Sequence, residues 1–482
     1  MDLAALVATI ALLALASWSL FFLQHLNLRR RMPPGPIGWP VLGSMREIPR
    51  LLSDPQKFQQ LVARYGPIVT LWNGSVATIL ISSPDIAREA LVEKGSVLAS
   101  RPDVPSMRLL TSGFKTINSS PYGVHWRATR KNLVSGILSP RVMSGFAPVQ
   151  EQAAEDLVRK LASEAKQSGG TVESLSVSVR CVLFQILSFV CFGRKLEEAK
   201  LEELNALMKE ATTMLHPVLG DLVPFLKVFT SHTKQKSFLV RQNQLLKGLL
   251  SRECPAASES YVQTLLSLQG KNLEDVDLDL AVLVRELFIA GADTTTNCVE
   301  WSMANLIKYP GIQERVFREL AENVGQKSGV KVADLPKLPY LHAVVKEALR
   351  KHPPVYLSAP RTPVHATKLA GYDIPKESTV VVHLQSLSND AGVWKNPDKF
   401  LPERFFEQTE LSKRMSMIPF GAGRRDCPGK HLGMLHVHLI VANLVQAFEW
   451  RAEGKEVDLS PRTVFTVQMK NPLRASICQR RS

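Results

Sequence analysis

Phe420-Gly421-Ala422-Gly423-Arg424-Arg425-Asp426-Cys427-Pro428-Gly429 is the most informative stretch of the sequence, because glycines surround a single thiol. Glycine adopts left-handed backbone conformations and permits close approach of another chain, so this stretch can form a tight turn that presents sulfur to a metal. Gly421 and Gly423 also resemble the start of a dinucleotide-binding loop, but Asp426 stands where its third glycine belongs. The stretch therefore predicts a cysteine ligand and not a nucleotide-binding turn.

Cys427 has the surroundings of an axial haem ligand, since a thiolate pushes electron density onto iron and favours O–O cleavage. Most lone cysteines are buried structural residues, but here the pattern Phe-x-x-Gly-x-Arg-x-Cys-x-Gly is complete. On this pattern the chain resembles the cytochromes P450. The resemblance implies a mainly α fold with small β-sheets and haem b between two helices, with Cys427 as the iron ligand. It also places Phe420, Arg425 and Gly429 at the haem, with Arg425 beside a propionate.

A second motif, Ala290–Thr295, lies inside a long predicted helix from Leu278 to Tyr309, which Pro310 ends. Glycine and consecutive threonines are poor helix formers. One interpretation is a kink in which threonine hydroxyls bond to carbonyls one turn earlier. The other is that small side chains leave room for O2. By resemblance, Asp293 and Thr294 then relay protons to the bound oxygen.

A third motif joins Glu347 and Arg350 in a predicted helix from Tyr340 to Lys351. At a spacing of i and i+3 the two side chains share one helix face. One interpretation is an ordinary surface pair, which contributes little. By resemblance, Glu347 and Arg350 form a buried cluster with Arg404, which has a structural role.

Trp126 and Arg130 are spaced i and i+4, so that both face the same side of a helix. An indole N–H and a guanidinium suit a haem propionate, although a tryptophan packed on an arginine stem is an alternative. Arg361 is a third candidate partner for the propionates. By resemblance, four further cations lie near the proximal haem face. They either dock an acidic electron donor or are simply solvated: Arg127, Lys131, Arg424 and Lys430.

The composition of the chain narrows the class of protein to which it can belong. The chain has 482 residues, 45% hydrophobic, and six scattered cysteines without a CxxC pair. This argues against a disulfide framework, a zinc site or an iron–sulfur cluster, and indicates a reducing compartment. The net charge of +15 fits a solvated basic surface, an anionic membrane or an acidic protein partner. There is no recognised nucleic-acid motif, so no nucleic-acid partner is expected.

The N-terminus indicates a membrane anchor. Residues 3–23 are almost uninterruptedly apolar, long enough to cross a bilayer, and Arg29–Arg31 follows. A cleaved signal peptide is the alternative, since Ala14-Leu15-Ala16 resembles a cleavage site, but there is no basic segment before the apolar run. We expect a single transmembrane helix at residues 1–24 and a basic, proline-rich hinge at 25–40. The monooxygenase domain at 41–482 is then expected on the cytoplasmic side of the endoplasmic reticulum membrane, in contact with membrane lipid.

The body of the chain is predicted to be one mainly helical domain. Residues 68–72 and 77–81 flank Asn73-Gly74, which predicts an early β-hairpin. From about 149 to 250 the pattern is mainly that of amphipathic helices.

The resemblance covers about residues 33–477 and is closest to microsomal land-plant members. It implies an enzyme that inserts one oxygen atom of O2 into a lipophilic small molecule. The electrons come from NADPH through an NADPH–haemoprotein reductase, since the chain has no NADPH or flavin signature. One departure is Asp426, where relatives usually carry an apolar residue. Its carboxylate either lowers the reduction potential of the iron or faces solvent.

The substrate is less defined. Residues 345–354 and 369–375 resemble a branch that hydroxylates or epoxidises fatty acyl chains in mid-chain, and Arg108 and Lys115 are candidate carboxylate anchors. Hydroxylation of a phenylpropanoid aromatic ring is the alternative. From other classes, a haem-thiolate isomerase would need no O2, and a haem sensor would need no reductase.

Overall fold

A computed structural model describes residues 29–36, 43–44, 55–73, 76–215, 221, 232–250, 260–270, 278–325, 329–407, 415–454 and 456–480. The expected membrane anchor lies outside these residues, as do 25–28 and 37–40 of the expected hinge. The chain divides into two compact units. The smaller holds the described residues up to Pro102 and Pro360–His383, and the larger holds the rest. That residues 41–482 act as one domain stays a prediction.

The smaller unit is built on a three-stranded sheet of order β1-β2-β6. Strand β1 (Ile68–Asn73) is antiparallel to β2 (Val76–Ile81), which confirms the predicted hairpin. Strand β6 (Thr379–Val382), almost 300 residues later, adds to β2 in parallel, with Leu80 opposite Val381. β-Branched residues fit such a pleated, half-buried surface. The remaining elements of this unit are α3 (Pro55–Tyr65), α4 (Pro84–Arg88), η1 (Glu89–Glu93), η2 (Val97–Ala99), β4 (Thr367–Leu369) and β5 (Tyr372–Ile374).

The described part of the hinge packs on β1. The carbonyls of Pro33 and Pro34 accept hydrogen bonds from the hydroxyl and the N–H of Thr70, at 2.7 Å and 2.9 Å. A Cβ at Gly35 would come within 1.9 Å of the Thr70 carbonyl oxygen, so only glycine fits there. The proline-rich segment is thereby fixed to the sheet at this point.

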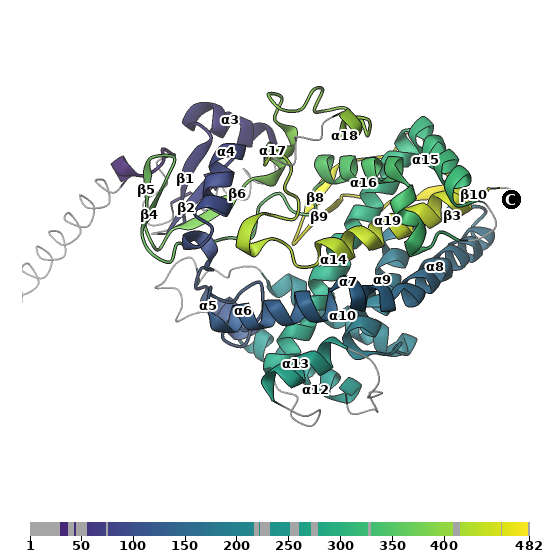
Figure 1. The fold of residues 1–482 in the computed structure, drawn as a ribbon, viewed down its shortest axis with the longest axis horizontal. Helices are drawn as coiled ribbons and strands as arrows, with labels where there is room; N and C mark the ends of the chain where they lie inside the picture. The colour runs from purple at the N-terminus through teal and green to yellow at the C-terminus, as the bar shows by residue number, and fades with distance from the viewer. Residues whose placement is uncertain are drawn as a thin grey trace, which may run out of the picture. The chain divides into compact units, whose positions relative to one another are not determined.

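The larger unit is organised around α14 (Leu278–Lys308), which packs against α9 (Leu175–Phe192), α19 (Lys430–Ala447) and α16 (Pro339–Lys351) (Figure 1). Helix α8 (Ala147–Gln167) packs against both α9 and α19. Most residues of α14 and α9 are buried, as expected for helices at the centre of a core. These helices form the core beneath the candidate site.

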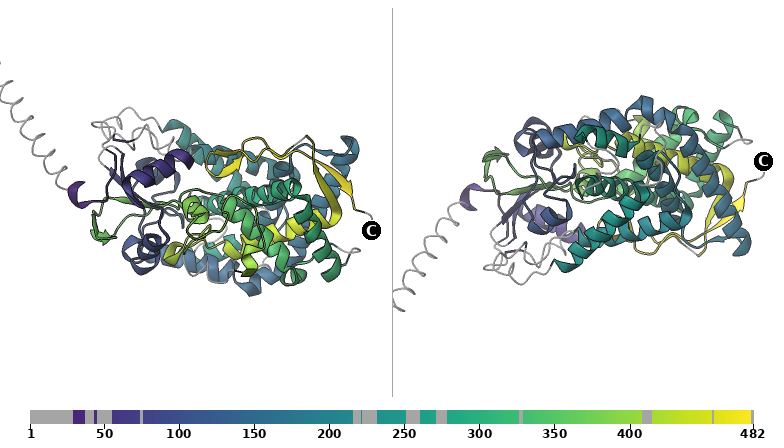
Figure 2. Two further views of the ribbon diagram at one scale, coloured as in Figure 1. Left: turned by 90° about the horizontal axis from the view of Figure 1, so that it is seen from above. Right: turned by 90° about the horizontal axis from the view of Figure 1, so that it is seen from below.

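Further described elements complete the larger unit. Figure 2 gives two further views of the fold, with the yellow strand β10 near the end marked C. The helices are α5 (Pro105–Leu110), α6 (Val124–Lys131), η3 (Asn132–Ile137), α7 (Pro140–Gly145), α10 (Glu198–Met214), α12 (Thr233–Leu250), α13 (Tyr261–Gln269), α15 (Pro310–Asn323), η6 (Val332–Lys337), α17 (Leu384–Asn389), α18 (Arg404–Glu407) and η8 (Gly423–Arg425). The strands are β3 (Thr171–Val172), β7 (Phe448–Ala452), β8 (Pro461–Thr463), β9 (Val467–Met469) and β10 (Ala475–Gln479). They form sheets of order β3-β10-β7 and β8-β9.

The prediction of a mainly α fold with small sheets is confirmed. One boundary differs: α14 ends at Lys308, and Pro310 starts α15 instead of only ending the preceding helix. Proline suits the first turn of a helix, where its missing N–H has no partner to lose.

Among the described residues, one helix is long and apolar enough to cross a membrane, α9. It is mostly buried and packs against α14 and α8, so it is a core helix of the larger unit.

Candidate active site

The Cys427 loop is a tight turn closed by its own backbone. The N–H of Cys427 donates to the carbonyl of Phe420 at 2.8 Å, and the N–H of Asp426 donates to the carbonyl of Gly423 at 3.1 Å. Gly421 and Gly423 have φ of 69° and 70°, in the left-handed region that glycine adopts without strain. The N–H of Gly429 hydrogen-bonds to the thiol. The glycines thus allow the turn and one N–H that points at sulfur, as the sequence predicts.

The thiol of Cys427 is accessible but poorly hydrated. The residue is exposed at the surface, yet burial by nearby protein is the largest influence on the thiol and raises its pKa. The Gly429 N–H lowers this pKa, Asp426 raises it, and the charges of Arg130 and Lys430 lower it. A thiol in this setting ionises readily only when a metal ion compensates its charge.

Helix α14 has one accessible face. From Leu280 to Ile307 its residues are buried except Glu286, Leu287, Ala290, Gly291 and Thr294. The last four are spaced i, i+3, i+4 and i+7 and form a single stripe, which we call the open face of α14. The hydroxyl of Thr294 donates to the carbonyl of Ala290 at 2.7 Å, the local bond that the kink interpretation expects. The oxygen of this hydroxyl can still accept a hydrogen bond from a donor on the open face of α14.

Asp293, next to Thr294, does not lie on the open face. It is buried and forms an ion pair with Arg180 of α9, whose Nε donates to Asn205 Oδ1 at 2.7 Å. Sequence reasoning missed Arg180. The signal was available, since Arg180 is the only charged residue in the apolar helix Leu175–Phe192, and a buried charge needs a partner.

Trp126 and two arginines provide an unsatisfied polar site on α6. The indole Nε1 of Trp126 is buried and has no hydrogen-bond partner within the part of the chain that the structure describes. The guanidinium carbons of Arg425 and Arg130 lie 4.3 Å and 5.5 Å from the centre of its ring. A buried N–H without a partner, close to two cations, is a good fit for an anionic acceptor such as a propionate.

Arg425 also binds the segment that follows α5. Its Nη1 donates to the Ile117 carbonyl at 3.0 Å, and its Nη2 to the Ser120 carbonyl at 2.5 Å. The carboxylate of Glu286 accepts the N–H groups of Ile117 and Asn118 at 2.7 Å and 2.6 Å. Segment 117–120 is therefore tied to the Cys427 loop on one side and to α14, beside its open face, on the other.

Arg130 reaches the same loop from α6. Its Nη1 donates to the main-chain carbonyl of Asp426 at 2.8 Å, and its Nη2 forms an ion pair with the Asp426 carboxylate. Asp426 therefore does not simply face solvent.

Comparison with known proteins accords with this geometry. The family profile described as Cytochrome P450 matches residues 33–478. Cytochrome P450 89A9 of Arabidopsis thaliana is 35% identical, covering 96% of this chain and 95% of its own length. The isoflavone 2'-hydroxylase of Medicago truncatula is 30% identical and covers 96% of each chain. A solved zebra fish cytochrome P450 with progesterone superposes with a TM-score of 0.77, at 26% identity over 89% of this chain and all of that one.

The chain belongs to the cytochrome P450 family.

As a P450 of land-plant type, it is an oxidoreductase of a monooxygenase family whose members hold haem through a cysteine thiolate. The residues at this site fit a haem. They provide an exposed cysteine in a glycine turn, the open face of α14, and a buried indole N–H that has no partner among the described residues and lies near two arginines.

The P450 chain also brings Glu347, Arg350 and Arg404 together. All three are buried, with Arg350 Nε and Arg404 Nε 2.7 Å and 3.2 Å from the Glu347 carboxylate. Arg350 Nη1 donates to the Ser388 carbonyl at 2.9 Å and Arg404 Nη1 to the Lys395 carbonyl at 2.8 Å. These contacts hold the backbone at Ser388 and Lys395. Because all three side chains are buried, the cluster is not an ordinary surface pair.

Arg361 lies in the smaller unit, whereas the other candidate propionate ligands belong to the larger unit. It is buried and exchanges two backbone hydrogen bonds with Val380, at 2.9 Å and 2.7 Å. Its role toward a propionate stays a prediction from the resemblance.

The four cations expected near the proximal face are all exposed, and Tyr122 joins two of them. Arg424 Nη1 lies 3.2 Å from the Tyr122 hydroxyl, and the guanidinium carbons of Arg127 and Arg424 lie 5.6 Å and 5.9 Å from its ring centre. We call Arg127, Lys131, Arg424 and Lys430 the basic patch.

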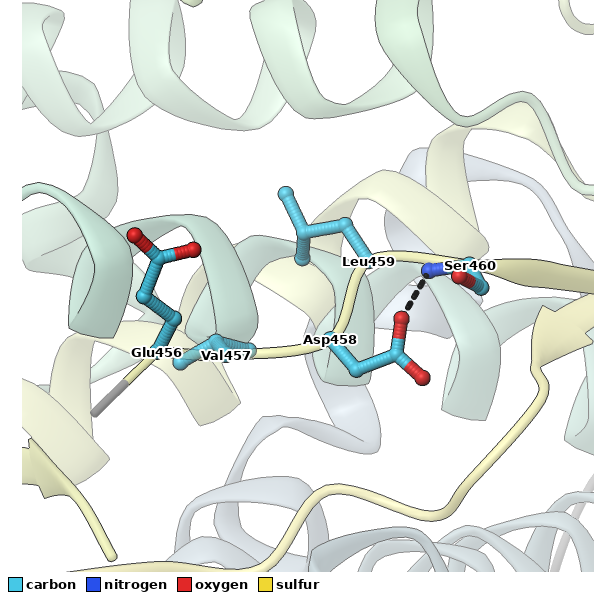
Figure 3. A pocket seen from close by; sticks show the side chains of 5 residues that line it. All are labelled: Glu456, Val457, Asp458, Leu459 and Ser460. Carbon is cyan, nitrogen blue, oxygen red and sulfur yellow. Dashed lines mark hydrogen bonds between the residues drawn. The ribbon is translucent and has the colours of Figure 1, made fainter. Parts of the chain in front are cut away.

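A surface pocket near the C-terminus contains none of the candidate residues. It is lined by the segment Glu456–Ser460, in which the Asp458 carboxylate accepts the Ser460 N–H at 2.9 Å (Figure 3).

Proposed function

We propose that this P450 inserts one oxygen atom of O2 into a lipophilic small molecule, with Cys427 as the axial ligand of haem b. The observation that carries the proposal is the exposed residue Cys427 within a glycine turn whose Gly429 N–H points at sulfur. Haem bound through a thiolate supplies O2 activation and O–O cleavage. Trp126, Arg130 and Arg425 hold its propionates with Arg361 as a further partner, and Phe420 and Gly429 shape the turn.

Thr294 and Asp293 have separate tasks in this proposal. The Thr294 hydroxyl, which donates to the Ala290 carbonyl, would accept a hydrogen bond on the open face of α14 and position a water molecule there. Asp293 supplies protons from the buried side of α14. To do so, its carboxylate must first leave Arg180 and contact a water molecule instead. The buried pair therefore limits when a proton is delivered.

Electrons come from NADPH through a membrane-bound NADPH–haemoprotein reductase. The basic patch gives an acidic partner a complementary surface next to the Cys427 loop. With an N-terminal anchor at residues 1–24, the enzyme and its reductase would share the endoplasmic reticulum membrane, with the catalytic domain in the cytoplasm.

For the substrate, we propose an uncharged aromatic compound as the first candidate and a fatty acyl chain as the second. The candidate carboxylate anchors already have acidic partners: Arg108 pairs with Asp103, and Lys115 lies 3.7 Å from Asp279. Two relatives are a flavonoid 3',5'-hydroxylase at 31% identity and an isoflavone 2'-hydroxylase at 30%. Mid-chain hydroxylation or epoxidation remains supported by the likeness of residues 345–354 and 369–375 to that branch.

The substrate class is tested by difference spectra of the purified haem protein. The panel holds flavonoids and cinnamyl alcohols, aldehydes and acids on one side, and long-chain fatty acids on the other. A low-to-high-spin shift with the aromatic compounds alone supports ring hydroxylation. A shift with fatty acids alone replaces it with the mid-chain assignment.

The ligand is tested by Cys427→Ala. This variant should lose the Soret band of the ferrous–CO form that is typical of thiolate ligation, while Cys478→Ala, another exposed cysteine, should keep it. A normal band in Cys427→Ala would refute the assignment. Reductase-dependent O2 uptake with product formation separates the monooxygenase from a haem-thiolate isomerase and from a sensor.

A further inference from the structure

Asp426, the residue directly before the thiol, is held twice by one guanidinium. Arg130 Nη1 donates to its main-chain carbonyl at 2.8 Å, and Nη2 forms an ion pair with its carboxylate. The Arg130 side chain is only 18% exposed, whereas that of Asp426 is 47% exposed. Solvent screens such a half-covered pair less than it screens a pair that is free on the surface.

These contacts fix the peptide group that joins Asp426 to Cys427. Its carbonyl oxygen accepts from Arg130, and its N–H donates to the Phe420 carbonyl at 2.8 Å. Both polar ends of the peptide that carries the thiol are thus bonded. The direction in which sulfur points is therefore set partly from α6, through Arg130.

The carboxylate also changes the charge around the sulfur. Without it, Arg130 would add an uncompensated positive charge beside the Cys427 loop. With it, the pair is close to neutral. The two residues place opposite charges beside the thiol, a carboxylate on Asp426 and a guanidinium on Arg130. A negative charge beside a metal ligand disfavours the addition of an electron to the metal.

We propose that Asp426 is a positioning residue that fixes Cys427 through Arg130 and lowers the reduction potential of the haem iron. The proposal rests on the proposed function, because it requires haem on Cys427. It concerns a position that the pattern Phe-x-x-Gly-x-Arg-x-Cys-x-Gly leaves open and that Asp426 fills in this chain. The iron accepts its first electron less readily, which makes reduction more dependent on bound substrate.

The test is a spectroscopic redox titration of the full-length holoprotein and of Asp426→Asn. The variant keeps the shape of the side chain and removes its charge. We expect a shift of the ferric–ferrous equilibrium toward ferrous iron of about tenfold, which is about 59 mV for one electron. Asp426→Ser is a second neutral variant, so the comparison does not depend on one substitution. Asp156→Asn, which opens the accessible ion pair with Arg159 on α8, is the matched control and should leave the potential unchanged.

Transfer of haem to apomyoglobin gives a second readout. Asp426→Ser should release haem several times faster than the wild type, because Arg130 loses one of its two contacts to the loop. An unchanged or lower potential in both neutral variants would overturn the proposal. Failure of the proposed function looks different, since the wild type itself would then show no thiolate-type ferrous–CO spectrum.

Discussion

Arg180 of α9 and Asp293 of α14 form an ion pair in the interior of the larger unit, with side chains only 13% and 10% exposed. The Arg180 guanidinium also lies 5.0 Å from the ring centre of Phe184. Burial lowers the pKa of Arg180 to about 10, so it stays charged at neutral pH. The acid of the Ala290–Thr295 motif is thereby neutralised by a residue that belongs to no motif.

Arg180→Ala should destabilise the protein by about 3–5 kcal/mol, because it leaves the Asp293 carboxylate buried without its partner. The measurement is the urea dependence of unfolding, followed by tryptophan fluorescence. Arg159→Ala removes an accessible arginine that pairs with Asp156 and should cost less than about 1 kcal/mol. Equal losses in the two variants would contradict the importance assigned to the buried pair.

Thr294→Ala should uncouple reduction from oxygenation, since the open face of α14 would lose the hydroxyl oxygen that can accept a hydrogen bond there. We expect several times more H2O2 per O2 consumed, measured with NADPH and reductase present. Thr294→Ser keeps the hydroxyl and should restore most of the coupling. Unchanged peroxide production in Thr294→Ala would remove this residue from the proton pathway.

Glu286→Ala should loosen segment 117–120, because two backbone N–H groups lose their acceptor. Hydrogen exchange at Ile117 and Asn118 should become at least tenfold faster, and substrate should bind more weakly while the ferrous–CO spectrum stays normal. Glu322→Gln, at an exposed position of α15, is the control. Unaltered exchange at both amides would show that Arg425 alone holds the segment.

Glu347→Gln should destabilise the chain by about 3–5 kcal/mol, because Arg350 and Arg404 are then buried without a carboxylate. Retained haem absorbance after heating is the measurement. Glu203→Gln removes an i, i+3 partner of Lys200 from an accessible position and should have almost no effect. Similar heat resistance of both variants would argue against a structural role for the cluster.

Stability should fall below neutral pH because of four histidines whose pKa is lowered by burial. Burial lowers the pKa of His352, His383 and His438 to about 3 and that of His436 to about 4. The unfolded chain takes up these protons near pH 6.5 and the folded chain does not, so stability is present above that pH and is lost as pH falls. Between pH 7.5 and 5.5 each histidine should cost about 1.4 kcal/mol.

His352→Phe tests this pH dependence. It keeps an aromatic ring where His352 stacks 4.1 Å from the Trp301 ring, and it removes one titrating group. The variant should lose about 1.4 kcal/mol less than the wild type over the same pH range, measured by urea unfolding. His365→Gln, at an exposed position, should match the wild type. An identical pH slope in His352→Phe would exclude His352 as a source.

The sequence by itself determined the class of fold, the position of the candidate ligand and the family. Gly421 and Gly423 permit a left-handed turn without strain, and the i, i+4 spacing of Trp126 and Arg130 puts both on one side of α6. Such features are local, because backbone sterics and helical periodicity act over a few residues.

Only the tertiary structure decided which side chains meet across the chain. It pairs Asp293 with Arg180, Asp426 with Arg130, and Glu286 with the backbone of Ile117. Each pair joins residues more than a hundred positions apart in the sequence. Burial creates these pairs, since a charge or N–H removed from water must find a partner, and which partner is near depends on how α14, α9 and the Cys427 loop pack.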